Sequence, residues 1–179
     1  MVRYADDLVV LCRTQAQAEA AHRWIVATLK GLRLECHPDK TRVVCVADGS
    51  QGFDFLGFHF RYLPSWRNRR RWVARCWPSQ RAMKSIRARV KEVTAPRARL
   101  HLPVEDIVKE LNPIVRGWGA YFRRPGASRQ LAQIDRYVVR RLELFVRKKH
   151  HWARAWETCA APAWQRSVGL YRLSGTNSA

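Results

Sequence analysis

The chain has 179 residues, 47% of them apolar and eight of them tryptophan, with a formal net charge of +20 and a pI near 11.1. It is long enough for one ordinary domain or two small ones, and apolar enough to bury a core. No run of about 18 apolar residues occurs, so no helix is expected to span a bilayer. Two early carboxylates argue against a secretory signal, and we expect a cytoplasmic protein.

The positive charge is distributed unevenly along the chain. Residues 1–60 contain seven Lys or Arg and seven Asp or Glu, whereas residues 61–179 contain 27 basic and seven acidic residues. The sequence therefore predicts a basic module attached to a neutral domain. Nucleic acid is the usual partner of such a module, and an anionic membrane surface is the alternative.

The cysteines and histidines indicate no metal site or disulfide framework. Five cysteines occur, an odd number, and none belongs to a C-x-x-C pair. Buried thiols in a reducing compartment fit this pattern better than disulfides or a zinc knuckle. His150-His151 has no Cys or carboxylate at ligand spacing, so we interpret it as part of a basic surface.

The segment Tyr4-Ala5-Asp6-Asp7 lies between two short strand-like stretches and predicts a tight turn. Adjacent carboxylates repel each other unless a cation lies between them. The turn is therefore either the metal-holding turn of a nucleotidyl-transfer enzyme or an ordinary solvated turn.

The rest of residues 1–60 predicts an α+β unit. Thr14 and Gln17 fit a capping box that opens a helix, and Gly31 fits its end. The apolar positions Ala18, Ala21, Ile25, Leu29 and Leu32 follow at helical spacing and should pack on the sheet. Short strands are predicted over residues 32–36, 42–46 and 53–60, with a turn at 37–41 and a bulge or close backbone approach at Leu56-Gly57.

Residues 61–78 predict a basic hairpin with Asn68 at its tip. Arg67, Arg69, Arg70 and Arg71 lie between Trp66 and Trp72. A solvated loop is one interpretation. Nucleic-acid contact is the other, with arginines on phosphates and tryptophans stacked on bases.

Residues 79–179 predict a helical domain. One helix begins after the cap Ser79, a second covers residues 104–111, a fresh helical start follows at Asn112-Pro113, and a long helix runs from the cap Ser128 to about residue 149. Gly117 and Gly119 should permit close helix contact, and residues 169–173 should fold back as a strand. The apolar faces comprise Ala82, Met83, Ile86, Val90 and Val93, then Ile114, Val115, Trp118, Tyr121 and Phe122, then Leu131, Ile134, Val138, Leu142 and Phe145.

Basic side chains lie opposite these apolar faces. Arg81, Lys84 and Lys91 do so in the first helix. In the long helix the spacing of 7, 4 and 7 residues aligns four arginines, followed by two lysines at the helix end: Arg129, Arg136, Arg140, Arg147, Lys148 and Lys149. Like charges in one line repel unless an anion lies over them, which favours a nucleic-acid backbone over a merely solvated face.

Several of these motifs together resemble the group II intron-encoded reverse transcriptases, which are also maturases. Tyr4-Ala5-Asp6-Asp7 resembles their signature turn, the stretches at 31–42 and 53–58 resemble later palm elements, and residues 78 onward, 110–118 and 136–142 resemble their thumb or maturase-specific domain X. The resemblance implies palm over residues 1–60, a connector hairpin over 61–78 and a helical thumb/X domain over 79–179.

The resemblance also implies roles for individual residues. Asp6 and Asp7 match carboxylates that hold two Mg²⁺ ions in the complete enzyme, and Lys40 matches a palm lysine near the departing pyrophosphate. Phe55, Leu56 and Gly57 match the turn that braces the primer. The implied partners are group II intron RNA and, for the complete enzyme, an RNA template and a DNA primer.

The chain departs from the family pattern at its start. Only three residues precede the turn, so we expect an earlier palm Asp and the fingers to be missing, and the chain to be a C-terminal part that does not polymerise alone. A separate polypeptide could supply that portion. A non-catalytic RNA-binding protein that assists splicing is the alternative function, and a remnant that folds poorly is a third.

Overall fold

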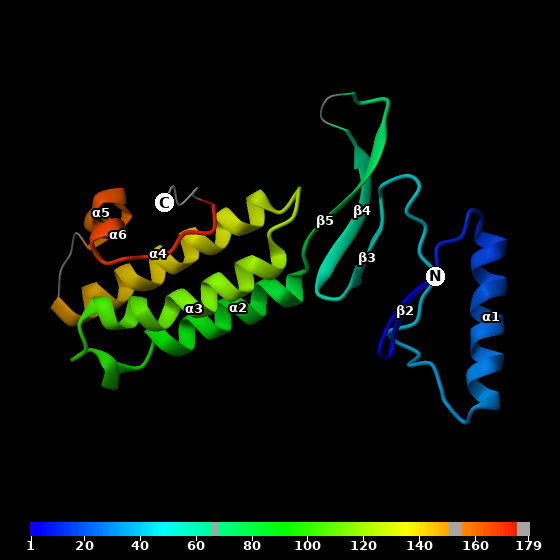
Figure 1. The fold of residues 1–179 in the computed structure, drawn as a ribbon, viewed down its shortest axis with the longest axis horizontal. Helices are drawn as coiled ribbons and strands as arrows, with labels where there is room; N and C mark the ends of the chain where they lie inside the picture. The colour runs from blue at the N-terminus through cyan, green and yellow to red at the C-terminus, as the bar shows by residue number, and fades with distance from the viewer. Residues whose placement is uncertain (66–67, 151–154, 175–179) are drawn as a thin grey trace. The chain divides into compact units, whose positions relative to one another are not determined.

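The computed structural model describes residues 1–65, 68–150 and 155–174 (Figure 1). Its helices and small antiparallel sheets confirm the predicted α+β class. The chain divides into two compact units, Met1–Arg75 and Cys76–Ala179, called unit 1 and unit 2 below. In the part that is described, no helix is long and apolar enough to cross a membrane.

Unit 1 begins with the predicted hairpin. Strand β1 (Val2–Tyr4) pairs antiparallel with β2 (Asp7–Val9), and Tyr4 lies opposite Asp7. Helix α1 (Gln15–Gly31) follows. Thr14 caps it as predicted, because its Oγ1 accepts a hydrogen bond from the Gln17 amide at 3.2 Å. The Gln17 side chain accepts from the Arg13 amide and not from that of Thr14 as a capping box requires.

The apolar face of α1 is only partly covered. Ala18, Ala21, Ile25 and Leu29 are half-buried, Leu32 is 66% exposed, and no residue of α1 is buried. The prediction was that this face packs on the sheet, and the structure leaves it only half-buried. A two-stranded ribbon offers too little apolar surface to cover a helix of 17 residues.

Two of the predicted strands in unit 1 are absent. Residues 32–36 and 42–46 form irregular structure, whereas the turn between them is present, with the Thr41 amide donating to the His37 carbonyl at 3.0 Å. Alternating apolar residues favour a strand only where a partner strand is available to pair with them. In the described residues neither segment has one.

A three-stranded sheet of order β3-β4-β5 contains β3 (Gly52–Phe55), β4 (Phe58–Pro64) and β5 (Trp72–Pro78). The predicted single strand over residues 53–60 is wrong, because Leu56 and Gly57 form a two-residue turn in which Phe55 pairs with Phe58. Both turn residues have positive φ, 50° and 79°, as a type I′ hairpin turn requires. The change of side-chain parity at this point therefore marks a hairpin and not a bulge.

Unit 2 is built on three long helices. They are α2 (Gln80–Thr94), α3 (Val104–Phe122) and α4 (Ser128–His150). The 3₁₀ turn η1 (Arg97–Arg99) precedes α3, and the short α5 (Ala155–Ala160) and α6 (Pro162–Ser167) follow α4. Helix α2 packs against both α3 and α4, and α5 packs against α4 (Figure 1).

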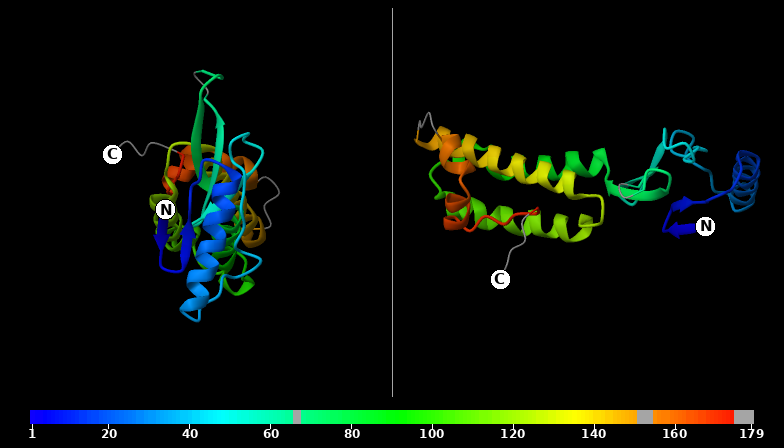
Figure 2. Two further views of the ribbon diagram at one scale, coloured as in Figure 1. Left: turned by 90° about the vertical axis from the view of Figure 1, so that its right-hand side faces the viewer. Right: turned by 90° about the horizontal axis from the view of Figure 1, so that it is seen from above.

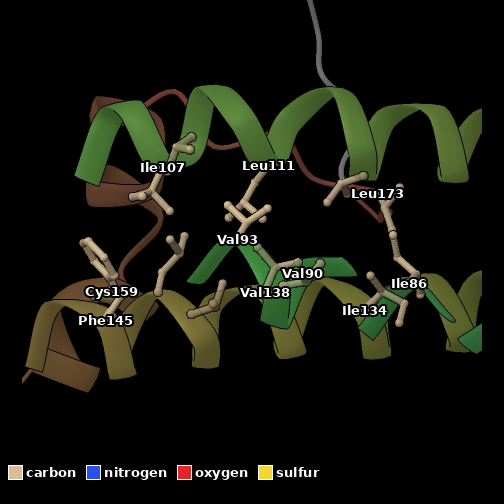
Figure 3. Packing of buried hydrophobic residues seen from close by; sticks show 14 of the residues in the cluster. Ile86, Val90, Val93, Ile107, Leu111, Ile134, Val138, Phe145, Cys159 and Leu173 are labelled. Atoms are coloured by element: carbon tan, nitrogen blue, oxygen red, sulfur yellow. The ribbon is translucent and has the colours of Figure 1, made fainter. Parts of the chain in front are cut away.

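The core of unit 2 contains most of the apolar positions predicted for its helices, together with Ile107 and Leu111 of α3, which were not predicted (Figure 3). Ile86, Val90 and Val93 of α2 meet Ile134 and Val138 of α4 there. All five residues predicted for the apolar face of α4 are buried: Leu131, Ile134, Val138, Leu142 and Phe145. Tyr121 is the exception on α3, being 52% exposed.

Two helix boundaries differ from those predicted. Helix α3 runs without interruption through Pro113, so the expected fresh start there is wrong. The packing of this helix on α2 and α4 holds it together across the missing amide. Ser128 is the first residue of α4 and not its cap; the Leu131 amide donates to the Ala127 carbonyl.

The chain after α6 returns along the bundle as an extended strap, residues 169–174 (Figure 2). It folds back as predicted but is not a strand, because the amides of Tyr171, Leu173 and Ser174 bind side chains. The buried carboxylate of Asp135 accepts from the amides of Leu173 and Ser174, both at 2.8 Å, and from the Ser174 hydroxyl. The Asn112 amide group binds the Gly169 carbonyl at 2.8 Å and the Tyr171 amide at 2.9 Å.

The two glycines of α3 behave differently. A methyl group on Gly119 would overlap Cδ2 of Leu173, so this glycine permits close approach of the strap and not of another helix as predicted. Gly117 is exposed with nothing nearby, so the prediction of close contact is wrong for it.

The cysteines are free thiols, but the expectation that they are buried holds for Cys159 alone. Burial, together with the carboxylate of Glu143, raises the pKa of the Cys159 thiol to about 11. Cys12 and Cys45 are exposed, since unit 1 has too little interior to cover them.

Candidate nucleic-acid interface

The turn carrying Asp6 and Asp7 is tight and exposed. Ala5 has φ +48°, in the left-handed region that non-glycine residues rarely adopt, and its carbonyl accepts a hydrogen bond from Arg3 Nε at 3.0 Å. Both carboxylates are exposed. Strained backbone of this kind is often found at functional sites, where the surrounding structure holds it in place.

These two carboxylates do not by themselves make a two-metal site. Two bridging Mg²⁺ ions need more oxygen ligands than two neighbouring side chains supply. Within the described residues, no three His, Cys, Asp or Glu side chains come together at ligand distance. The residues present therefore fit only part of such a site.

The other palm residues named from the sequence also lie in unit 1. Lys40 is exposed in the turn after His37, whose carbonyl accepts from the Lys40 amide at 3.2 Å. Phe55, Leu56 and Gly57 form the β3–β4 turn, where the positive φ of Leu56 is a second strained position. Because this strain needs a supporting structure, the turn is held in a defined shape.

The basic hairpin predicted over residues 61–78 is present as β4 and β5. The Asn68 side chain accepts from the Arg70 amide at 3.0 Å, and its carbonyl accepts from the Arg71 amide at 2.9 Å. Arg69, Arg70 and Arg71 are exposed. Trp66 and Arg67, which belong to the predicted hairpin, lie outside the described residues.

The basic residues predicted in unit 2 lie on α2 and α4. Arg81, Lys84 and Lys91 are exposed on α2, and Arg129, Arg136, Arg140, Arg147 and Lys148 are exposed on α4. The two helices pack directly on each other. Packed helices have axes about 8–10 Å apart, so the two basic rows are carried by immediate neighbours in the bundle.

Two members of the predicted set have structural partners. Arg140 forms an ion pair at 2.5 Å with Glu143, whose side chain is only 4% exposed, so its charge compensates a buried carboxylate. Lys149 donates to the carbonyl of Leu102 at 2.5 Å and so ties the end of α4 to the segment before α3. Their side chains are less available to an external anion than those of Arg129 or Arg136.

Three residues where α2 and α4 pack together were not among the predicted nucleic-acid-binding residues. The Arg87 guanidinium lies 5.9 Å from the centre of the Tyr137 ring, and Arg141 Nε donates to Thr94 Oγ1 at 2.9 Å. All three side chains, Arg87, Tyr137 and Arg141, are half-buried. They flank the apolar stripes of their helices, a position that would have identified them once the two helices were known to be neighbours.

Two protein-family models match the chain. The model for the group II intron maturase-specific domain matches residues 83–164, and the model for reverse transcriptase (RNA-dependent DNA polymerase) matches residues 1–60. A reverse-transcriptase segment followed by this particular domain is the combination found in group II intron proteins.

The chain belongs to the group II intron reverse transcriptase/maturase family. The maturase-specific match covers α2, α3 and α4, which carry the core and the basic rows. The reverse-transcriptase match covers the Asp6-Asp7 turn and the β3–β4 turn. A comparison with curated proteins found no match.

Proposed function

We propose that unit 2 binds the backbone of group II intron RNA through the exposed cations of α2 and α4 and thereby assists splicing. The observation that carries the proposal is the row of Arg129, Arg136 and Arg147 along the solvent side of α4, opposite its buried face. Within the described residues, none of the three forms an ion pair. A line of uncompensated charge is favourable when a polyanion lies over it.

The buried face of α4 makes the row rigid. Leu131, Ile134 and Val138 fix the rotation of the helix in the core, so the arginines on the other side keep their spacing. The helix backbone is already ordered before binding, so only the arginine side chains lose conformational freedom when RNA binds. Phosphate contacts of this kind supply affinity and positioning rather than sequence recognition, so discrimination between introns needs other contacts.

The test is RNA affinity as a function of salt. We expect the triple variant Arg129→Gln, Arg136→Gln and Arg147→Gln to bind intron RNA about 10- to 100-fold more weakly at low salt. Its plot of log affinity against log salt should be shallower by about 2 to 3, since fewer counterions are released on binding. Fluorescence anisotropy with a labelled domain of the intron RNA measures both quantities.

The matched control replaces three exposed arginines elsewhere in unit 2: Arg97, Arg124 and Arg166. Arg140 is left out of the test variant because removing it would also leave Glu143 buried without its partner. If both triple variants lose affinity and salt dependence equally, only net charge matters and the α4 row has no specific role.

We further propose that Asp6 and Asp7 provide two of the oxygen ligands for Mg²⁺, since reverse transcriptases generally use divalent metals. The remaining ligands, and the pocket for the incoming nucleotide, would have to come from another polypeptide segment. With these in place, the chain would take part in DNA synthesis on an RNA template from a DNA primer. Without them, we propose that the protein acts through RNA binding alone.

A further inference from the structure

Two aromatic rings lie together on the β4–β5 hairpin of unit 1. Tyr62 of β4 and Trp72 of β5 stack with ring centres 5.7 Å apart and planes inclined by 24°. They are 37% and 36% exposed. An aromatic pair that is neither buried nor fully solvated leaves part of its ring surface available to a flat ligand.

The loop that contains Gly49 packs against Trp72 and holds its ring in place. Gly49 has φ +67°, and a methyl group on it would lie 2.6 Å from the Tyr62 carbonyl oxygen and 2.7 Å from the Trp72 ring. Arg61 fixes this loop, because its Nε donates to the Gly49 carbonyl at 2.7 Å and its guanidinium also donates to the Ser50 carbonyl at 3.2 Å. The indole is therefore preorganised, which reduces the entropy lost when a ligand stacks on it.

The same hairpin carries a run of positive charge beside the rings. Arg69, Arg70 and Arg71 are exposed and immediately precede Trp72. The Ser65 amide donates to the Arg71 carbonyl at 2.6 Å, so the two sides of the hairpin are hydrogen-bonded to each other here. The three arginines occupy the turn just before β5, and because consecutive Cα atoms are about 3.8 Å apart, their Cα atoms lie within about 11 Å of that of Trp72.

We propose that Tyr62 and Trp72 form a stacking platform for the bases of single-stranded nucleic acid, with Arg69, Arg70 and Arg71 binding the adjoining phosphates. An aromatic surface beside a basic run is how proteins hold unpaired strands, since every base has a face to stack and every nucleotide a phosphate. A duplex hides those faces in its own stack. The platform therefore selects unpaired RNA or DNA, independently of the backbone contacts proposed for α4.

The test compares one substitution at two tryptophans of unit 1 in the full chain. Trp72→Leu should lower affinity for a 12-nucleotide oligouridine about tenfold and leave affinity for a 12-base-pair RNA duplex within twofold. Trp24→Leu, at an indole that is 68% exposed on α1, should change neither. Trp72→Phe should retain most of the affinity for oligouridine, because it keeps an aromatic face.

Salt dependence separates stacking from charge. Trp72→Leu should shift the affinity without changing its salt slope, whereas replacing the three arginines by Gln should make the slope shallower. Every measurement is repeated with Arg129, Arg136 and Arg147 replaced by Gln. A single-strand preference that survives there, but disappears with Trp72→Leu, supports the platform even if the α4 proposal fails.

The outcome that overturns the proposal is an equal loss for single strand and duplex, or an equal effect of Trp24→Leu. Circular dichroism checks that each variant folds. If Trp72→Leu unfolds the hairpin, Tyr62→Leu and Trp72→Phe provide the test instead. The proposal is wrong if Tyr62→Leu leaves oligouridine affinity unchanged. An apolar peptide that competes with oligouridine, when heparin of equal charge does not, would identify a protein-binding face instead.

Discussion

Units 1 and 2 differ most in where their apolar side chains lie. All buried hydrophobic residues belong to unit 2, from Met83 to Leu173, and no hydrophobic side chain in the described part of unit 1 is buried. Unit 1 instead exposes large apolar side chains, among them Leu11, Trp24 and Leu34. The residues that match reverse-transcriptase motifs thus lie in unit 1, whose described part has no buried core. The basic rows of α2 and α4 lie in unit 2, which has one.

The difference follows from how many layers each unit contains. In unit 2, α2 has both α3 and α4 to cover its apolar stripe, and α5 covers a further side of α4. In unit 1, α1 has only a short ribbon nearby, and the apolar faces of a helix and a sheet need a second layer to become buried. We therefore expect the fold of unit 2 to be stable without a partner, and the apolar face of α1 to need one for its burial.

Primer extension gives the largest expected contrast between the units. With Mg²⁺, an RNA template and a DNA primer, we expect no detectable synthesis by this chain, although the same preparation binds RNA. The reason is that Asp6 and Asp7 supply only part of a two-metal site. Synthesis that Asp6→Asn abolishes would contradict this expectation and show that unit 1 assembles a complete site.

Rates of amide hydrogen exchange should give the second-largest contrast between the two units. We expect amides in the centres of α2, α3 and α4 to exchange at least about a thousandfold more slowly than those of α1, because exchange from a packed core needs global opening. Mass spectrometry of peptides from the full chain measures this. Equal protection in α1 would mean that a partner surface, in this chain or a second copy, covers its apolar face.

The smallest expected effects come from two glycines of one helix. Gly119→Ala should destabilise unit 2 by about 1–3 kcal/mol, because the new methyl group displaces the buried side chain of Leu173. Gly117→Ala should stabilise it by about 0.5–1 kcal/mol, through helix propensity alone. Urea unfolding followed by circular dichroism at 222 nm reports both values.

The two variants act as controls for each other, since both make the same change two residues apart on α3. If Gly119→Ala also stabilises unit 2, Leu173 of the strap does not pack against Gly119 as closely as it does in the structure. If both destabilise, the effect lies in the backbone of α3 near Pro113 and not in the contact with Leu173.

The sequence by itself determined the local features of this protein. Helical spacing predicted the buried faces of α2 and α4, and the hydroxyls of Thr14 and Ser79 predicted where α1 and α2 begin. The Asp6-Asp7 turn and the basic hairpin were predictable from turn residues. These features depend on residues close in sequence, and so their physical causes can be read along the chain.

Only the tertiary structure decided which distant groups meet. Pro113 lies within a continuous helix because packing outweighs the local preference to break there, and residues 42–46 are not a strand because no partner is present in the described structure. Asp135 binds the strap from 38 residues away, and Tyr62 of β4 stacks on Trp72 of β5. Such contacts depend on the three-dimensional path of the chain, which local periodicity does not specify.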